Sequence, residues 1–333
     1  MKAVVITQPG GPEVLSVQEV ADPQPGAGQI VIDIYASALN RADLLQRQGA
    51  YPPPADAPPY PGLEAAGRVF SVGKGVSLFE PEMRVMALLA GGGYAEKVVV
   101  PQETVMPVPD GLSFRQAAAI PEVWLTAYSN MIEIGGLGKG ERVRQAGMSV
   151  LIHAGGSGVG SAAIQLAKRQ GATVFSTASA KKMARVKALG ADVVIDYRKE
   201  NFADRILEET NGRGVELIID FIGAPYWHDN LRALSLWGRL VLVGLMGGNK
   251  VKTNLGLFLR KKLSIHGSTL RDRTLEQKAS LIKRFSRDVL PALASGELRP
   301  IVDKRQFALD EVVEAHRYME ANQNFGKIIL KVK

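Results

Sequence analysis

Four glycines separate a short apolar run from an amphipathic segment near the middle of this 333-residue chain. The apolar run is Ser149-Val-Leu-Ile-His-Ala, and the turn that follows it contains Gly155, Gly156, Gly158 and Gly160. A strand, a glycine-rich turn and a helix in this order make a dinucleotide-binding fingerprint, whose glycines permit a tight turn, a close backbone approach and tight helix packing. The feature constrains the fold strongly, because such a turn belongs at the edge of a parallel sheet.

The turn departs from the strict fingerprint at one position. Gly155 and Gly160 match the outer glycines, whereas Ser157 stands at the middle one. We expect Gly158 to keep the turn open, so that the Ser157 hydroxyl and backbone amides such as that of Val159 face a pyrophosphate at the helix N-terminus. A purely structural turn is the alternative.

Two other glycine motifs are excluded at this turn. A P-loop would end in Lys-Ser or Lys-Thr, where this chain has Val159-Gly160-Ser161. A hydrolase nucleophile elbow would place glycine two residues after the serine, where Val159 stands.

Short strands alternate with helical patterns around the turn. We expect strands over residues 150–153, 173–177, 193–196, 217–221, 240–243 and 263–266, and helices over 159–170, 180–189, 202–210, 227–235 and, more weakly, 255–259. This alternation predicts βαβ units with right-handed crossovers, and therefore a doubly wound, six-stranded parallel sheet of the Rossmann type.

The N-terminal third is typical of β structure. Apolar or β-branched runs cover residues 3–7, 14–20, 30–38, 66–72, 85–89 and 96–100, which is the spacing of an all-β barrel or sandwich. The proline-rich residues 51–62 are expected to form a surface loop. Helices at 115–120 and 123–132 then lead into the alternating region.

The C-terminal tail has no neighbour in the alternating series. It is expected to contain a helix over 275–294, a strand near Phe307, a helix over 310–321 and a strand over 327–332. We place it back on the N-terminal β domain. The predicted domains are therefore residues 1–125 with 270–333, and residues 126–269, in a fold of the α/β plus β class.

Composition excludes several kinds of chemistry. The chain has no cysteine, so disulfides, thiolate zinc sites, iron–sulfur clusters and cysteine nucleophiles are ruled out. No apolar run is long enough for a membrane helix, and the N-terminus resembles no signal peptide, so a cytoplasmic protein is expected.

The net charge of +8 is local. Residues 250–287 contain eleven Lys or Arg against two acids, which makes +9 and leaves −1 for the remaining chain. A basic balance suits nucleic acid, an anionic membrane surface or a phosphate-bearing ligand.

The end of the second Rossmann strand distinguishes between the two nicotinamide cofactors. An NAD-binding chain usually has Asp or Glu there for the ribose diol, but this one continues Ser179-Ala180-Lys181-Lys182. A hydroxyl and an ammonium suit a 2′-phosphate, which favours NADPH. The alternative is that these lysines are merely solvated on a helical turn.

Several motifs resemble a known superfamily. Residues 38–43 (Ala-Leu-Asn-Arg-Ala-Asp), 62–67 (Gly-Leu-Glu-Ala-Ala-Gly) and 91–96 (Gly-Gly-Gly-Tyr-Ala-Glu), followed by the glycine turn, occur in the order typical of medium-chain dehydrogenases and reductases. Residues 46–51, 118–122 and 244–248 are similar to the zeta-crystallin-like quinone oxidoreductases, in particular the branch that includes the tumour-suppressor-inducible quinone oxidoreductase. The resemblance runs essentially end to end and implies a GroES-like β domain beside the Rossmann domain.

The resemblance also implies chemistry without a metal. Zinc members of the superfamily have cysteine where Asn40 stands and histidine where Leu63 stands. Without a Lewis acid, polarising a simple ketone or an alcohol oxyanion would be difficult. A quinone or an activated enone is therefore the expected hydride acceptor, held against the nicotinamide in a dry cleft.

The resemblance assigns roles residue by residue. Asn40 and Tyr51 would lie beside the nicotinamide and substrate. The remaining cofactor contacts would be Thr126, Ser157, Ser179, Lys181, Tyr197, Ile222, Gly244, Leu245, Ser268 and Asn324, with Ser179, Lys181 and Tyr197 around the adenosine phosphate.

Structural roles remain open for three of these residues. Asn40 could cap a helix over residues 41–47, Tyr51 could pack under the proline-rich loop, and Tyr197 could fill the core. The four histidines lack ligand spacing and are expected to be structural.

The main functional hypothesis is an NADPH-dependent quinone reductase without a metal. The alternative is an enoyl or alkenal double-bond reductase, in which Tyr51 would protonate the α-carbon. RNA binding or a structural, crystallin-like role is a third possibility, disfavoured because the basic segment lacks interleaved aromatic residues. The resemblance implies a homodimer or homotetramer joined through residues 263–266, and no membrane partner.

Overall fold

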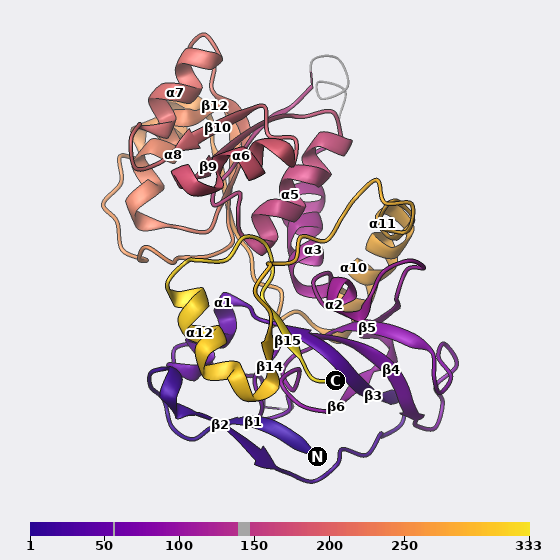
Figure 1. Ribbon diagram of the computed structural model, residues 1–333. Coiled ribbons are helices and arrows are strands. Elements are labelled where there is room, and N and C mark those ends of the chain that lie inside the picture. The colour runs from indigo at the N-terminus through magenta and orange to yellow at the C-terminus, as the bar shows by residue number, and fades with distance from the viewer. Residues whose placement is uncertain (56, 139–146) are drawn as a thin grey trace. The chain divides into compact units, whose positions relative to one another are not determined.

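The computed structural model describes residues 1–55, 57–138 and 147–333, and the chain divides into two compact units. Unit 1 comprises Met1–Leu125 and Leu270–Lys333, and unit 2 comprises Thr126–Thr269. Figure 1 labels the elements of both units. Each unit is described below by itself.

Unit 2 is built on a six-stranded sheet in which every pairing is parallel. The strands are β8 (Ser149–Ile152), β9 (Thr173–Ala178), β10 (Val193–Asp196), β11 (Val215–Asp220), β12 (Leu234–Leu242) and β13 (Ser264–Gly267). Their order is β10-β9-β8-β11-β12-β13, so the direction of winding reverses between β8 and β11. The predicted doubly wound Rossmann sheet is confirmed.

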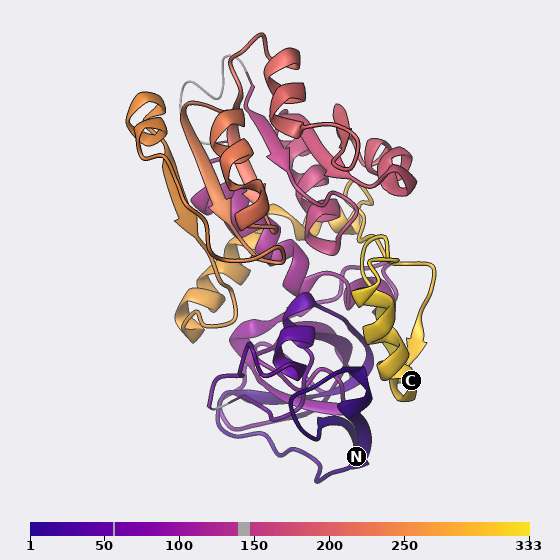
Figure 2. The ribbon, with the colours of Figure 1, turned by 90° about the vertical axis from the view of Figure 1, so that its left-hand side faces the viewer.

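Helices connect the strands on both faces of this sheet (Figure 2). They are α5 (Gly158–Arg169), α6 (Ala180–Ala188), α7 (Phe202–Glu209), α8 (Trp227–Ala233) and α9 (Gly256–Lys261). Right-handed crossovers place α5 and α6 on one face and α7 to α9 on the other. On the second face, Phe202 and Ile206 of α7 pack with Leu151, Phe175 and Ile218 of the sheet.

Unit 1 contains a seven-stranded mixed sheet. Its strands are β3 (Gln29–Ala38), β4 (Glu64–Val72), β5 (Arg84–Leu88), β6 (Lys97–Pro101), β7 (Val105–Pro107), β14 (Phe307–Ala308) and β15 (Ile329–Lys331). β15 lies antiparallel to β3, with Ile329 opposite Ala38, so the C-terminal tail completes the N-terminal sheet as expected. β1 (Lys2–Ile6) and β2 (Leu15–Glu19) form a separate hairpin.

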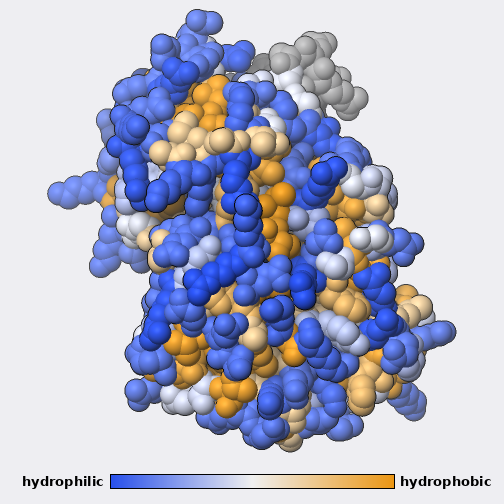
Figure 3. Space-filling view, in the orientation of Figure 1, coloured by the Kyte–Doolittle hydropathy of each residue, from blue (hydrophilic) through white to orange (hydrophobic). Residues whose placement is uncertain are grey.

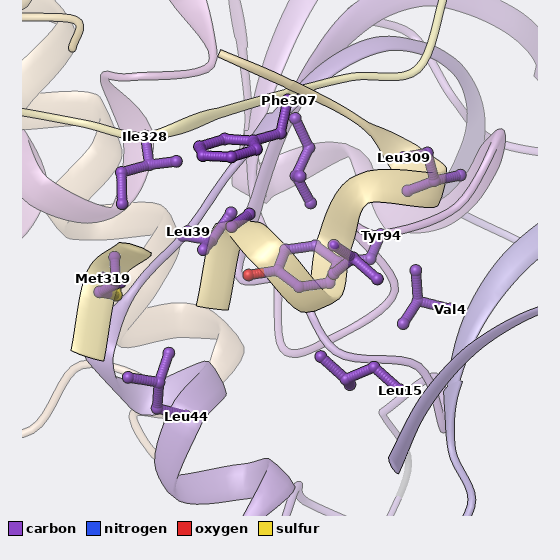
Figure 4. Packing of buried hydrophobic residues seen from close by; sticks show 12 residues of the cluster. Val4, Leu15, Leu39, Leu44, Tyr94, Phe307, Leu309, Met319 and Ile328 are labelled. Carbon is purple, nitrogen blue, oxygen red and sulfur yellow. The ribbon is translucent and has the colours of Figure 1, made fainter. Parts of the chain in front are cut away.

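One buried cluster joins the two ends of the chain within unit 1. Figure 4 shows the Tyr94 ring among aliphatic side chains from β1, β2 and the C-terminal tail. Leu39 and Ile328 belong to this cluster. Leu39 precedes Asn40 and Ile328 follows Lys327, and both of these polar residues belong to the site described below. Burial of the cluster therefore fixes the backbone on which those polar side chains stand.

The helices of unit 1 are short, with one exception. They are α1 (Arg41–Arg47), α2 (Phe114–Ala117), α3 (Pro121–Tyr128), which runs on into a π-helix (Ser129–Ile134), α10 (Leu275–Asp288), α11 (Leu290–Ala294) and α12 (Val312–Glu320). Only the last residues of α3 and the π-helix lie in unit 2.

Two expected elements need correction, and one strand was not expected. The helix over 275–294 is two helices, because Pro291 has no N–H for the Arg287 carbonyl and its ring crowds that carbonyl. β12 begins six residues before the expected strand, and Trp237 within it has a positive φ of 65°. β7 was not expected; its three residues end in Pro107, which limits pairing to its neighbour β5.

On the face drawn in Figure 3, hydrophilic side chains predominate and apolar ones form small groups. Among the described residues, no helix combines the length and the hydropathy needed to cross a bilayer.

Candidate active site

The glycine turn requires its outer glycines for steric reasons. A Cβ on Gly155 would lie 2.1 Å from the Ser176 hydroxyl oxygen, and one on Gly160 would lie 2.4 Å from the Ala154 carbonyl oxygen. The Ser157 hydroxyl accepts a hydrogen bond from the Gly160 N–H at 3.0 Å and so caps α5. The turn therefore brings α5 close against β8 and β9.

A buried network of hydrogen bonds supports the glycine turn. The Thr177 hydroxyl accepts from the Ala154 N–H at 3.1 Å and contacts His153 Nδ1 at 3.1 Å. His153 Nε2 lies 2.8 Å from Asn230 Oδ1, and Asn230 Nδ2 donates to Asp220 Oδ2 at 3.0 Å. His153 thus has the structural role expected of it, and burial lowers its pKa.

Replacing Thr177 with valine is expected to destabilise unit 2 by about 1–3 kcal/mol, because the Ala154 N–H and His153 lose a partner without a change in shape. Urea denaturation measures the loss. Thr173→Val, at the exposed start of the same strand, is the control and should cost less than about 0.5 kcal/mol. Equal stability of the two variants would contradict the supporting role of Thr177.

Most predicted cofactor residues lie at the carboxyl edge of the unit 2 sheet. Because all its strands run in parallel, the residues that follow them share one edge. This group comprises Gly155, Ser157, Gly158, Val159 and Gly160 after β8, Ser179 and Lys181 after β9, Tyr197 after β10, Ile222 after β11, Gly244 and Leu245 after β12, and Ser268 after β13.

The part of this edge that follows β9 and β10 is polar and basic. Ala178 and Asp196 end paired strands at the same level, so Ser179 and Tyr197 leave the sheet side by side. Ser179 is the N-cap residue of α6, whose first turn contains no acid. Tyr197 is 41% exposed, which excludes the core-filling alternative.

Unit 1 contains a buried polar cluster around Asn40. The Lys327 ammonium lies 2.6 Å from Glu64 Oε1 and donates to Asn40 Oδ1 at 2.7 Å, while Asn40 Nδ2 donates to Glu64 Oε1 at 3.0 Å. Asn40 does occupy the N-cap position of α1, but its side chain makes no capping hydrogen bond. The amide is used for the cluster instead.

Asp43 takes over the capping of α1. Its carboxylate accepts from the Asn40 N–H at 2.7 Å, the Tyr94 hydroxyl at 2.9 Å and the Gly62 N–H at 3.1 Å. Burial raises the pKa of Asp43 to about 6, although these donors and the nearby Lys327 favour the ionised form.

Tyr51 is held by an arginine from the C-terminal segment. The Arg271 guanidinium carbon lies 5.2 Å from the centroid of the Tyr51 ring. Arg271 is itself buried and donates to the Ala90 carbonyl at 2.9 Å and to Gln46 Oε1 at 2.8 Å. Tyr51 is partly exposed, so one part of its ring is available to a ligand while the other is fixed.

This cluster does not fit a zinc ion. Asn40 Oδ1 and Glu64 Oε1 both face the Lys327 ammonium, which is a positive charge already in contact with both oxygens. Leu63 is buried and offers no donor atom.

Two further predicted residues, Thr126 and Asn324, make local hydrogen bonds. Thr126 is on α3, with its carbonyl accepting from Asn130 Nδ2 at 2.8 Å. Asn324 is buried in the tail, where its Nδ2 donates to the Gly326 carbonyl at 2.8 Å. The structure adds no contact that gives either residue a part in a site.

The sequence reading missed Glu64, Glu122, Arg271 and Lys327. A charged residue between apolar neighbours was the available signal for two of them. Glu64 stands in Gly-Leu-Glu-Ala-Ala, and Glu122 in Ile-Pro-Glu-Val-Trp. Buried charges need partners, but the sequence does not show which.

Part of the basic segment 250–287 has internal roles. The Lys261 ammonium donates to the carbonyls of Leu231 and Leu234 at 3.1 and 2.6 Å, and Lys278 donates to the Arg271 carbonyl at 2.6 Å. With Arg271 buried as well, the +9 of this segment is not a continuous solvated surface.

Comparisons with known proteins agree with this architecture. The family model "Zinc-binding dehydrogenase" matches residues 158–286, and "Alcohol dehydrogenase GroES-like domain" matches residues 26–110. The quinone oxidoreductase of Lama guanicoe is 32% identical, over 100% of this chain and 98% of its own.

Solved structures give the same result. A structure titled as an NAD-dependent alcohol dehydrogenase has a TM-score of 0.88 at 32% identity, and covers both chains fully. The Escherichia coli quinone oxidoreductase complexed with NADPH has a TM-score of 0.86 at 29% identity, again over both whole chains.

The two-unit fold, the glycine turn at the carboxyl edge of the sheet and these matches define an oxidoreductase of the medium-chain dehydrogenase/reductase superfamily. Within that superfamily, the chain belongs to the quinone oxidoreductase family.

Proposed function

We propose that this protein is an NADPH-dependent quinone reductase that works without a metal. The main observation behind this proposal is the carboxyl edge of the sheet in unit 2. There, the glycine turn and the N-terminus of α5 follow β8, and the basic, acid-free first turn of α6 follows the neighbouring strand β9. The names of the relatives and the NADPH bound to the Escherichia coli structure support the proposal.

The residues of unit 2 fit a dinucleotide. The space at Gly155 and Gly160 is too small for any side chain, so only glycine fits at these two positions of the turn. Gly158, Val159 and Ser157 would hold the pyrophosphate, and Ser179 and Lys181 the 2′-phosphate. When bound, the nicotinamide supplies the hydride.

In unit 1, Asn40 and Tyr51 would contact the hydride acceptor and position it. Lys327 and Glu64 fix both ends of the Asn40 amide, and Arg271 fixes the Tyr51 ring. Rigid placement of these groups restricts the acceptor to one orientation, which is how positioning accelerates a transfer.

Steady-state rates with 1,2-naphthoquinone and with a 2-enoyl thioester test the proposal. NADPH-dependent turnover of the quinone is expected. Turnover of the thioester alone, abolished in Tyr51→Phe, would instead identify a double-bond reductase. That alternative stays open, because a partly exposed tyrosine hydroxyl serves either acceptor.

Lys181→Met is expected to weaken NADPH binding by about tenfold and to leave NADH binding unchanged, because only the 2′-phosphate meets the ammonium. Fluorescence titration with both cofactors measures this. Lys187→Met, on the last turn of α6, is the matched control and should change neither affinity. Equal affinity of the unmodified protein for NADPH and NADH would contradict the phosphate site.

Assembly and location remain predictions. β13 ends the sheet, and no strand among the described residues pairs with its outer side, so we propose that this edge joins two copies in a homodimer or homotetramer. Light scattering of the purified protein tests the assembly. A cytoplasmic location stays an expectation from the sequence.

A further inference from the structure

Three carboxyl groups of unit 1 lie within one electrostatic cluster, but their hydrogen bonding differs. Asp43 accepts from three donors, and Glu64 accepts from Lys327, from Asn40 and, at 2.9 Å, from the Glu122 backbone N–H. Ionised carboxylates need such donors when they are buried.

The Glu122 carboxyl group has no such support. Within the described parts of the chain, no donor lies at hydrogen-bond distance from its side-chain oxygens. The two cations of the cluster are already engaged, Lys327 by Glu64 and Asn40, and Arg271 by Gln46 and the Ala90 carbonyl. Glu122 is therefore the carboxyl group that keeps its proton.

Charge balance gives the same assignment. Asp43, Glu64 and Glu122 face Lys327 and Arg271, so full ionisation would leave one uncompensated negative charge in a largely buried cluster. The pKa of Glu122 is raised to about 8, first by burial and then by the Glu64 carboxylate, while Lys327 and Arg271 oppose the shift and Asp43 adds to it.

Glu122 also lies beside the proposed acceptor side. Its backbone N–H donates to Glu64 Oε2 at 2.9 Å, and Glu64 Oε1 accepts from the Asn40 amide at 3.0 Å. Burial raises the pKa of the Tyr51 hydroxyl, the charges of Glu122 and Asp272 add to this rise, and Arg271 opposes it. The Glu122 side chain is partly exposed, which leaves it a route to a ligand and to solvent.

We propose that Glu122 is the acid that supplies the proton consumed when the acceptor is reduced. This inference rests on the proposed function. A quinone takes a hydride and one proton to become a hydroquinone. The O–H bond of Glu122 breaks, an O–H bond forms on the acceptor, the electron pair arrives with the hydride, and the resulting carboxylate regains its proton from water.

Infrared titration of the protein without cofactor tests the stored proton independently of any acceptor. A protonated-carboxyl band should be present at pH 7 and should disappear as the pH passes about 8. The band should be absent from Glu122→Gln. It should persist in Glu80→Gln, a control at an exposed position in unit 1. Absence of that band in the unmodified protein at pH 7 would overturn the proposal.

Stopped-flow oxidation of NADPH by 1,2-naphthoquinone tests the transfer itself. Glu122→Gln should lower kcat about 100-fold and leave KM for NADPH within about twofold. The alkaline limb of the pH–kcat profile and the solvent deuterium isotope effect on kcat should both be lost. Glu122→Asp should recover part of the rate. A kcat within about threefold of the unmodified protein would refute the role of Glu122. If the unmodified protein reduces only the 2-enoyl thioester, the proposed function fails, and the same variants tested with that thioester decide the proton donor.

Discussion

Replacing Lys327 with methionine is expected to lower the free energy of unfolding of unit 1 by about 3–5 kcal/mol. Lys327 and Glu64 are 3% and 0% exposed, and their charged atoms lie 2.6 Å apart. Methionine fills a similar volume but leaves the Glu64 carboxylate buried without its cation. Removing one member of a buried ion pair costs more than the pair contributes, because the remaining charge is not solvated.

Urea denaturation at pH 7 measures this effect. The double variant Lys327→Met/Glu64→Gln should recover part of the stability, since a neutral amide no longer needs the ammonium. Lys333→Met is the matched control, because Lys333 pairs with Asp33 while 44% exposed and should cost less than about 1 kcal/mol. Equal losses for Lys327→Met and Lys333→Met would contradict the buried-pair interpretation.

Gly160→Val is expected to reduce NADPH affinity at least about 100-fold, a loss of about 2.7 kcal/mol of binding free energy. The first side-chain carbon would lie 2.4 Å from the Ala154 carbonyl oxygen and 2.9 Å from the Gly155 Cα, which are backbone atoms. The helix must therefore move away from the turn, and its N-terminal amides move with it.

Fluorescence titration with NADPH measures this loss, with circular dichroism as a check that the sheet still forms. Gly256→Ala is the control, since a Cβ there would meet only side-chain atoms, Asn254 Oδ1 at 3.1 Å and Arg260 Nη1 at 3.7 Å, and alanine suits the start of α9. Unchanged NADPH affinity in Gly160→Val would show that the cofactor does not bind at this turn.

Local patterns predicted the Rossmann unit closely. The helix expected over 159–170 is α5, Gly158–Arg169, because an amphipathic period, a serine cap and a preceding strand all act over a few residues. The tail was harder, since Pro291 divides one amphipathic stretch into two helices. Only the pairing of β15 with β3 shows where that tail packs.

Asn40 shows the limit of local reasoning about the site. The sequence correctly placed it before a helix, and asparagine is a favoured cap. Its side chain instead meets Glu64, 24 residues away, and Lys327, 287 residues away. Asp43 caps the helix through the Asn40 N–H, so the local preference for a cap was met by another side chain.

The sequence by itself determined the glycine turn, the parallel sheet and the absence of cysteine chemistry, because each depends on residue type and short-range spacing. The tertiary structure decided which buried charges meet. Glu64, Glu122 and Lys327 are far apart in the chain, and only the packing of β15 on β3 and of α3 near β4 brings their atoms together. Ionisation depends on the solvent and partners around each group, so the properties of this cluster follow from the folded unit and not from the order of residues.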